Sequence, residues 1–110
     1  MIAKELSSGE PSVMSRKRVL IVDDHPVVRQ GLKTLIDKTA DMQTCGEAQS
    51  VYDALQCIDR LKPDVVAADL SLGGDSGLDL VKDIRIRYPH LPVLIVSVHD
   101  EGVYAERVLR

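Results

Sequence analysis

Apolar residues fall into four short runs along the chain, and each run is followed by a segment whose apolar positions recur at helical spacing. The runs cover residues 19–22, 42–48, 64–69 and 91–97. Continuous apolar runs of this length are typical of strands buried on both faces of a parallel sheet. The second run is the least apolar of the four, so we expect it to lie nearer an edge.

Helical spacing predicts four helices. The first begins at Pro26, which suits the first helical turn because proline lacks an N–H group. The second is capped by Ser50 and ended by Pro63, the third follows a loop at residues 71–77, and the fourth covers residues 101–110. The expected inner faces of the first three helices are Val27, Val28, Leu32, Leu35 and Ile36, then Ala54, Leu55, Ile58 and Leu61, then Leu78, Leu80, Val81, Ile84 and Ile86.

This alternation of strands and helices, with connections of a few residues, predicts an α/β fold with a doubly wound parallel sheet. The chain has 110 residues, 45% of them hydrophobic, which suits one domain. Residues 1–17 lack any sustained periodicity and are interpreted as a disordered tail, so the domain covers residues 18–110. A net charge of −3 does not favour nucleic acid binding across the whole surface.

The cysteines and the hydropathy of the chain indicate in which cellular compartment the protein lies. Cys45 and Cys57 lack the spacing of a metal site, so we interpret them as reduced structural thiols. No apolar run approaches the roughly 20 residues of a membrane span, and no signal peptide is recognisable at the N-terminus. We therefore expect a soluble, cytoplasmic protein without membrane contact.

Polar residues gather where the predicted strands end. Asp23 and Asp24 follow the first strand, Asp69 ends the third, and Ser97 ends the fourth. Ligands bind at the carboxyl ends of the strands in such a sheet, so these side chains should converge. Three carboxylates held together repel one another, and a hard divalent cation with oxygen ligands, best Mg²⁺, removes that conflict. Helix capping is the alternative role for the first two acids.

Other chemistries fit the sequence less well. A phosphate-binding loop would need a glycine-rich turn with Lys-Ser/Thr after the first strand, and a dinucleotide site would need G-x-G-x-x-G there; neither motif is present. An aspartate that accepts a phosphoryl group beside Mg²⁺ and a hydroxyl fits the residues present. His25 adjoins the acids, and a hydrogen-bonded or solvated ring is favoured over a metal ligand.

Three motifs occur in the order expected of one family. They are VLIVDDHPVVRQGL, DVVAADLSLGGDSGLDLVKDIR and PVLIVSVHDE. Together they resemble the receiver domain of two-component response regulators, in particular the NarL/FixJ-like subfamily, in which a LuxR-type helix-turn-helix domain follows the receiver. The resemblance covers residues 18–110. It implies a flavodoxin-like (CheY-like) fold and transfer of a phosphoryl group from a sensor histidine kinase to an aspartate.

The resemblance also assigns roles to residues. Asp69 matches the phosphoacceptor, Asp24 the acid that coordinates Mg²⁺ directly, and Asp23 the acid that acts through water. Ser71 matches the position whose backbone carbonyl binds the metal. Ser97 matches the hydroxyl residue that reaches the phosphoryl oxygen and moves on activation.

Two features of the family are absent from this sequence. Receivers carry a lysine and a switch aromatic on a fifth strand, and neither is present by residue 110. We therefore expect the receiver to be incomplete at its C-terminus, without the fifth strand and last helix. The strand at residues 91–97 would then have an open apolar edge, so we expect further residues that encode a strand with a lysine and a helix. If Arg110 is the true C-terminus, another chain or the tail must cover that edge instead. DNA binding would require a C-terminal domain that this chain lacks.

The resemblance favours a phosphorylation-switched domain of a transcription regulator that is not itself an enzyme and that forms a homodimer on phosphorylation. A protein-interaction module that is never phosphorylated is the alternative. A Mg²⁺-dependent phosphatase fits less well, because those enzymes carry a second acid two residues after the nucleophile, where Ser71 stands.

Overall fold

The computed structural model describes residues 16–69, 71–72, 75–99 and 102–108, with the backbone alone at residues 71–72, 75–77, 97–99 and 102–108. Its elements are β1 (Lys17–Val22), α1 (Pro26–Asp37), β2 (Met42–Ala48), α2 (Val51–Leu61), β3 (Val65–Asp69), β4 (Ser71–Leu72), β5 (Asp75–Ser76), α3 (Gly77–Arg87), β6 (Val93–His99) and β7 (Gly102–Val108). Within these ranges no helix has the length and apolar character needed to cross a membrane.

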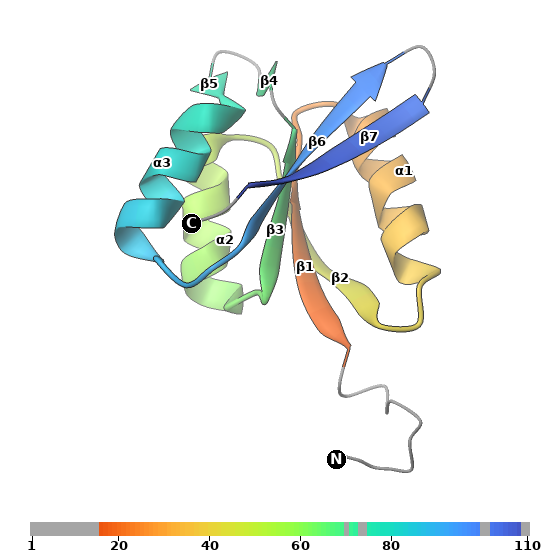
Figure 1. Cartoon of the computed structure of the whole chain (residues 1–110), viewed down its shortest axis with the longest axis horizontal. Helices are drawn as coiled ribbons and strands as arrows, with labels where there is room; N and C mark the ends of the chain where they lie inside the picture. The colour runs from red at the N-terminus through yellow and green to blue at the C-terminus, as the bar shows by residue number, and fades with distance from the viewer. Residues whose placement is uncertain (1–15, 70, 73–74, 100–101, 109–110) are drawn as a thin grey trace.

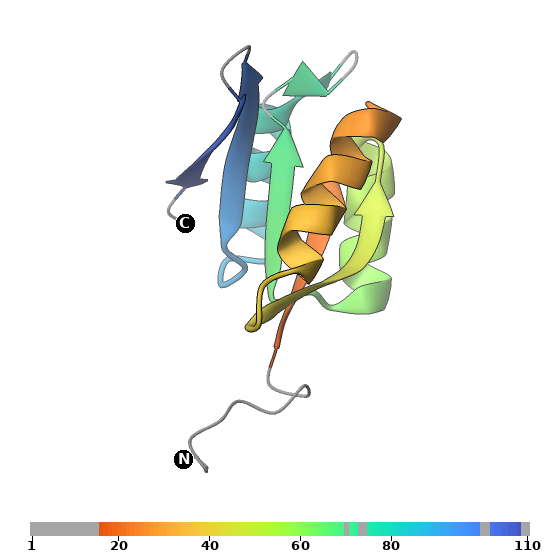
Figure 2. The ribbon, with the colours of Figure 1, turned by 90° about the vertical axis from the view of Figure 1, so that its right-hand side faces the viewer.

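The main sheet has the order β2-β1-β3-β6-β7, and its first four strands are parallel. Figures 1 and 2 show α1 on one face of this sheet and α2 and α3 on the other. The predicted doubly wound α/β fold is therefore confirmed. The prediction that residues 42–48 lie near an edge is also confirmed, because β2 pairs only with β1.

Burial on both faces explains the apolar run of β1. Leu20 and Val22 belong to a core cluster beneath α2 and α3, whereas Val19 and Ile21 belong to a second cluster beneath α1. Side chains of a strand alternate between faces, so a strand covered on both sides needs apolar residues at consecutive positions.

Local sequence signals set the limits of α2. The side chain of Ser50 accepts a hydrogen bond of 3.1 Å from the backbone N–H of Asp53, as its position before the helix predicts. At the other end Lys62 has a left-handed backbone (φ 53°), and Pro63 follows and prevents the helix from continuing.

Parts of the predicted inner helix faces are wrong. Val27 and Leu35 of α1 are exposed, as are Leu78 and Ile86 of α3. Helical spacing marks a broad apolar stripe, but only the residues directly over the sheet are buried. In α1 the buried residue is Leu32, and in α3 the buried residues include Leu80, Val81 and Ile84.

The C-terminal segment differs most from the prediction. Residues 101–110 were predicted as a helix, but the structure has strand β7, which pairs antiparallel with β6 from Val93↔Val108 to His99↔Gly102. The edge of β6 carries unpaired backbone groups, and β7 satisfies them. Among the described residues, the edge of β6 that was expected to be open is paired with β7. The segment at residues 71–77 is likewise not simply a loop, because β4 and β5 form a short antiparallel pair.

Candidate metal and phosphoryl site

Three acids meet at the carboxyl ends of two neighbouring strands. Asp23 and Asp24 follow β1, and Asp69 is the last residue of β3. These strands are adjacent and in register, with Val22 opposite Ala68, so their ends lie at the same edge of the sheet. One donor atom from each of Asp23, Asp24, His25 and Asp69 lies within 4.8 Å of the others. The structure thus brings together the three carboxylates that the sequence singled out.

Two carboxylate oxygens in this cluster have unmet hydrogen-bonding capacity. Asp23 is only 1% exposed, and its Oδ2 atom is buried without a hydrogen-bond partner. The Oδ1 atom of Asp24 is also buried and accepts no hydrogen bond. Buried carboxylate oxygens are costly unless a donor or a cation satisfies them. The oxygen donors therefore fit a hard divalent cation.

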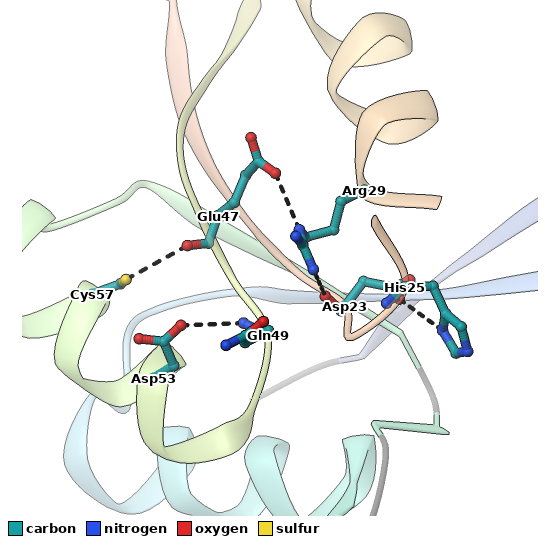
Figure 3. Close-up of polar contacts among 7 residues, drawn as sticks. All are labelled: Asp23, His25, Arg29, Glu47, Gln49, Asp53 and Cys57. Atoms are coloured by element: carbon teal, nitrogen blue, oxygen red, sulfur yellow. Dashed lines mark hydrogen bonds and ion pairs between the residues drawn. The ribbon is translucent and has the colours of Figure 1, made fainter. Parts of the chain in front are cut away.

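Arg29 holds the end of β1 in place. Figure 3 shows its guanidinium between Asp23 and Glu47, where Nη1 donates a 2.8 Å hydrogen bond to the carbonyl oxygen of Asp23 and Nε donates a 3.1 Å bond to Oε1 of Glu47. The backbone N–H of Asp23 also donates to the carbonyl of Ala48. Sequence reasoning missed Arg29; its place on the first turn of α1, four residues after His25, is the available signal.

His25 lies at the N-cap of α1 and contacts both neighbouring acids. Its backbone N–H donates to Oδ1 of Asp23 at 2.8 Å, and its ring Nδ1 lies 3.1 Å from the same oxygen (Figure 3). The hydrogen bond to Asp23, followed by the charge of Asp24, raises the pKa of His25 above its ordinary value. The expectation of a hydrogen-bonded ring is confirmed.

Known proteins share this arrangement of elements. Residues 19–110 match the family described as the response regulator receiver domain. The transcriptional regulatory protein YdfI of Bacillus subtilis is 39% identical over 76% of this chain and 39% of its own length. A two-component response regulator of the LuxR family from Aurantimonas has a solved structure that matches with a TM-score of 0.73 at 32% identity, covering 78% of this chain and 61% of that one.

This chain belongs to the response regulator receiver domain family. The receiver resembles the transcription regulators and also a protein-glutamate methylesterase/protein-glutamine glutaminase of Pyrococcus horikoshii, at 35% identity over 84% of this chain and 26% of that enzyme. It therefore spans about a quarter to two fifths of these whole-length relatives.

Two remaining predicted site residues of the receiver lie partly outside the described residues. The backbone of Ser71 begins β4, and the backbone of Ser97 lies on β6 one position beyond Val96, which pairs with Asp69. The side chains of both serines fall outside what the structure describes.

A second feature of the receiver lies at the opposite end of the sheet. A cavity of about 430 Å³ is lined by the residues that precede β3 and β6, among them Lys62, Asp64 and Leu91. The four-residue cluster around Asp23 is not part of it. The acids are the candidate site, because among the described residues they bring convergent charges together with two buried oxygens that lack hydrogen-bond partners.

Proposed function

We propose that this receiver is a phosphorylation switch in which Asp69 accepts a phosphoryl group from a sensor histidine kinase. The convergence of three carboxylates within 4.8 Å, with two buried oxygens unsatisfied, is the observation that supports this most directly. Family membership supports the same chemistry. The domain itself is a phosphoacceptor rather than an enzyme.

In the proposed reaction an oxygen of the Asp69 carboxylate attacks the phosphorus atom of the donor. An O–P bond forms on Asp69 while the P–N bond of the kinase phosphohistidine breaks, and the histidine nitrogen leaves with the bonding electrons. Asp24 and Asp69 would hold Mg²⁺ directly, Asp23 through water, and Ser71 through its backbone carbonyl. The bound ion would neutralise charge on the transferring oxygens. Arg29 would keep Asp23 in position.

Ser97 would report the phosphorylated state to the rest of the molecule. A hydroxyl that donates to a phosphoryl oxygen gains a charge-assisted hydrogen bond worth about 1.5–3 kcal/mol, and only after phosphorylation. That gain would bias a two-state element and favour homodimer formation. The position of Ser97 on β6, next to the partner of Asp69, supports this role.

The output of the whole protein is proposed to be transcription control in the cytoplasm. Relatives named as transcriptional regulators, including YdfI, support a DNA-binding output, and a methylesterase output is the competing possibility. We propose that the receiver begins with β1 at Lys17, one residue before the expected start of the domain. In the whole protein it would be followed by a fifth strand with a lysine, a further helix and a helix-turn-helix domain.

The test compares the chain with its Asp69→Asn variant. Each protein is incubated with a small phosphodonor and Mg²⁺, and incorporation of acid-stable, base-labile phosphate is measured by intact mass. We expect one phosphoryl group on the parent chain and none on the variant. Equal incorporation in both proteins would refute Asp69 as the acceptor. No incorporation in either, with a folded parent, would favour the interaction-module alternative.

A further inference from the structure

The ring of His25 is close enough to both acids to share a metal ion with them. Its Nδ1 atom lies 2.9 Å from Oδ1 of Asp24 and 3.1 Å from Oδ1 of Asp23. We propose that Nδ1 of His25 is a nitrogen ligand of the metal held by Asp23, Asp24 and Asp69. The site would then accept first-row transition-metal dications, such as Mn²⁺ and Ni²⁺, in addition to Mg²⁺. This inference rests on the metal site proposed above.

The separations of the donor atoms fit neighbouring ligands of one ion. Metal–ligand distances to oxygen and imidazole nitrogen are about 2.0–2.1 Å, so two ligands at right angles around one ion lie about 3 Å apart. The 2.9 Å distance from His25 Nδ1 to Oδ1 of Asp24, the acid proposed to bind the ion directly, is close to that value. Asp69 also offers a donor atom within the 4.8 Å limit of the cluster, so a nitrogen and the carboxylates are near enough to share one ion.

Hydrogen bonding alone does not satisfy this group of atoms. Nδ1 carries at most one hydrogen, so it cannot donate fully to Oδ1 of both Asp23 and Asp24. Oδ1 of Asp24 has no other hydrogen-bond partner, and Oδ2 of Asp23 is buried without one. A cation bound by Nδ1 and Oδ1 of Asp24, with a metal-bound water donating to Oδ2 of Asp23, would satisfy all three atoms. Because Asp23 is only 1% exposed, bulk water cannot satisfy its buried oxygen in place of the metal site.

The position of the ring leaves it available for this role. His25 is the N-cap residue of α1, but its side chain does not cap the helix. Its side chain is 62% exposed, so metal binding would not require other packing to be broken. Imidazole nitrogen favours transition metals over Mg²⁺, and affinity for such donors rises from Mn²⁺ towards Ni²⁺. A receiver with this ligand should therefore bind Ni²⁺ more tightly than Mg²⁺.

The experiment uses the untagged 110-residue chain and two histidine variants. His25→Gln removes the imidazole but keeps a polar side chain, and His90→Gln is the matched control because His90 is exposed and lines the cavity at the other end of the sheet. Mn²⁺ is added to each protein, and coupling between the electron spin and ¹⁴N is recorded by pulsed EPR. Affinities for Ni²⁺ and Mg²⁺ are measured by calorimetry. Thermal unfolding checks that each variant is folded.

We expect ¹⁴N coupling in the parent and in His90→Gln, and its loss in His25→Gln. Affinity for Ni²⁺ should fall about tenfold or more in His25→Gln, with a much smaller change for Mg²⁺. Metal binding without ¹⁴N coupling, and equal Ni²⁺ affinity in parent and His25→Gln, would overturn the role of His25 and leave the carboxylate site intact. Absence of metal binding in the parent, or unchanged binding in Asp24→Asn, would instead refute the site itself.

Discussion

At the scale of single residues, the site gathers three carboxylates beside the ring of His25, whose Nδ1 atom lies 3.1 Å from Asp23 and 2.9 Å from Asp24. Asp23 and Asp24 each bury an oxygen without a hydrogen-bond partner, and Asp69 lies beside them. Arg29 donates to the backbone carbonyl of Asp23 and pairs with Glu47. Its charge is therefore used to hold the loop rather than to pair with the acids. Without a bound metal, repulsion among the three carboxylates should lower the free energy of unfolding of the domain.

A prediction follows for Asp24→Asn. Without metal, the variant should be more stable than the parent by on the order of 1 kcal/mol, because one of three neighbouring charges is removed. With saturating Mg²⁺ the parent should instead be the more stable of the two proteins, since only the parent gains binding free energy. Urea unfolding at neutral pH, in EDTA and in Mg²⁺, measures both values. Asp59→Asn is the control, because Asp59 is 77% exposed and should change little in either condition. A metal-free Asp24→Asn variant less stable than the parent would contradict the repulsion argument.

At the scale of elements, helix α1 has space for a side chain at its glycine, whereas strand β2 does not. Gly31 lies in the middle of α1, and an added Cβ would meet nothing within 4 Å. Gly46 lies in β2, where the register with β1 shifts between Val19 and Leu20, and an added Cβ would lie 2.6 Å from Cδ1 of Leu61. The same substitution should therefore have opposite effects at the two positions.

We predict that Gly31→Ala raises the free energy of unfolding by about 0.5–1 kcal/mol, because alanine loses less backbone entropy in a helix. Gly46→Ala should lower it by about 0.5–1.5 kcal/mol, since the end of the Leu61 side chain must move away from its present rotamer. Chemical denaturation of both variants tests the pair, and Gly46→Ala combined with Leu61→Ala serves as the control that removes the clash. Similar changes for both single variants would mean that packing against α2 does not explain the glycine in β2.

At the scale of the whole molecule, the two faces of the sheet are covered unequally. Among the described residues, α2 and α3 cover one face and α1 alone covers the other (Figure 1). An apolar cavity of about 270 Å³ lies on the α1 face, with Ile36, Val65 and Leu94 among its lining residues. The further helix proposed above would cover this face. The proposed fifth strand would need the edge of β6 that β7 occupies.

β7 and the proposed fifth strand cannot both pair with the same edge of β6, so a fifth strand would have to displace β7. In the 110-residue chain, backbone chemical shifts of residues 102–108 should be those of a strand, with cross-strand contacts between Val96 and Ala105. In a longer chain that contains the proposed fifth strand, the same residues should leave the edge and show the helical shifts that their sequence pattern predicts. NMR on both chains tests this. Strand shifts in the longer chain would show that β7 is retained and that a fifth strand does not pair with β6.

The sequence by itself determined most of the parallel sheet and the composition of the site. Apolar runs with both faces buried specify strands such as β1 almost without reference to the rest of the chain, because each position needs an apolar side chain. Carboxyl ends of neighbouring parallel strands meet by topology, so Asp23, Asp24 and Asp69 could be placed together from their positions alone.

Tertiary structure alone decided the features that depend on partners distant in sequence. Whether Leu35 or Leu78 is buried depends on which surface each helix meets, and periodicity does not contain that information. Residues 102–108 form β7 because the open edge of β6 offers backbone hydrogen bonds, which outweigh a weak local preference for helix. The unsatisfied oxygens of Asp23 and Asp24, and the approach of His25 to both residues, depend on side-chain conformations that only the packed structure fixes.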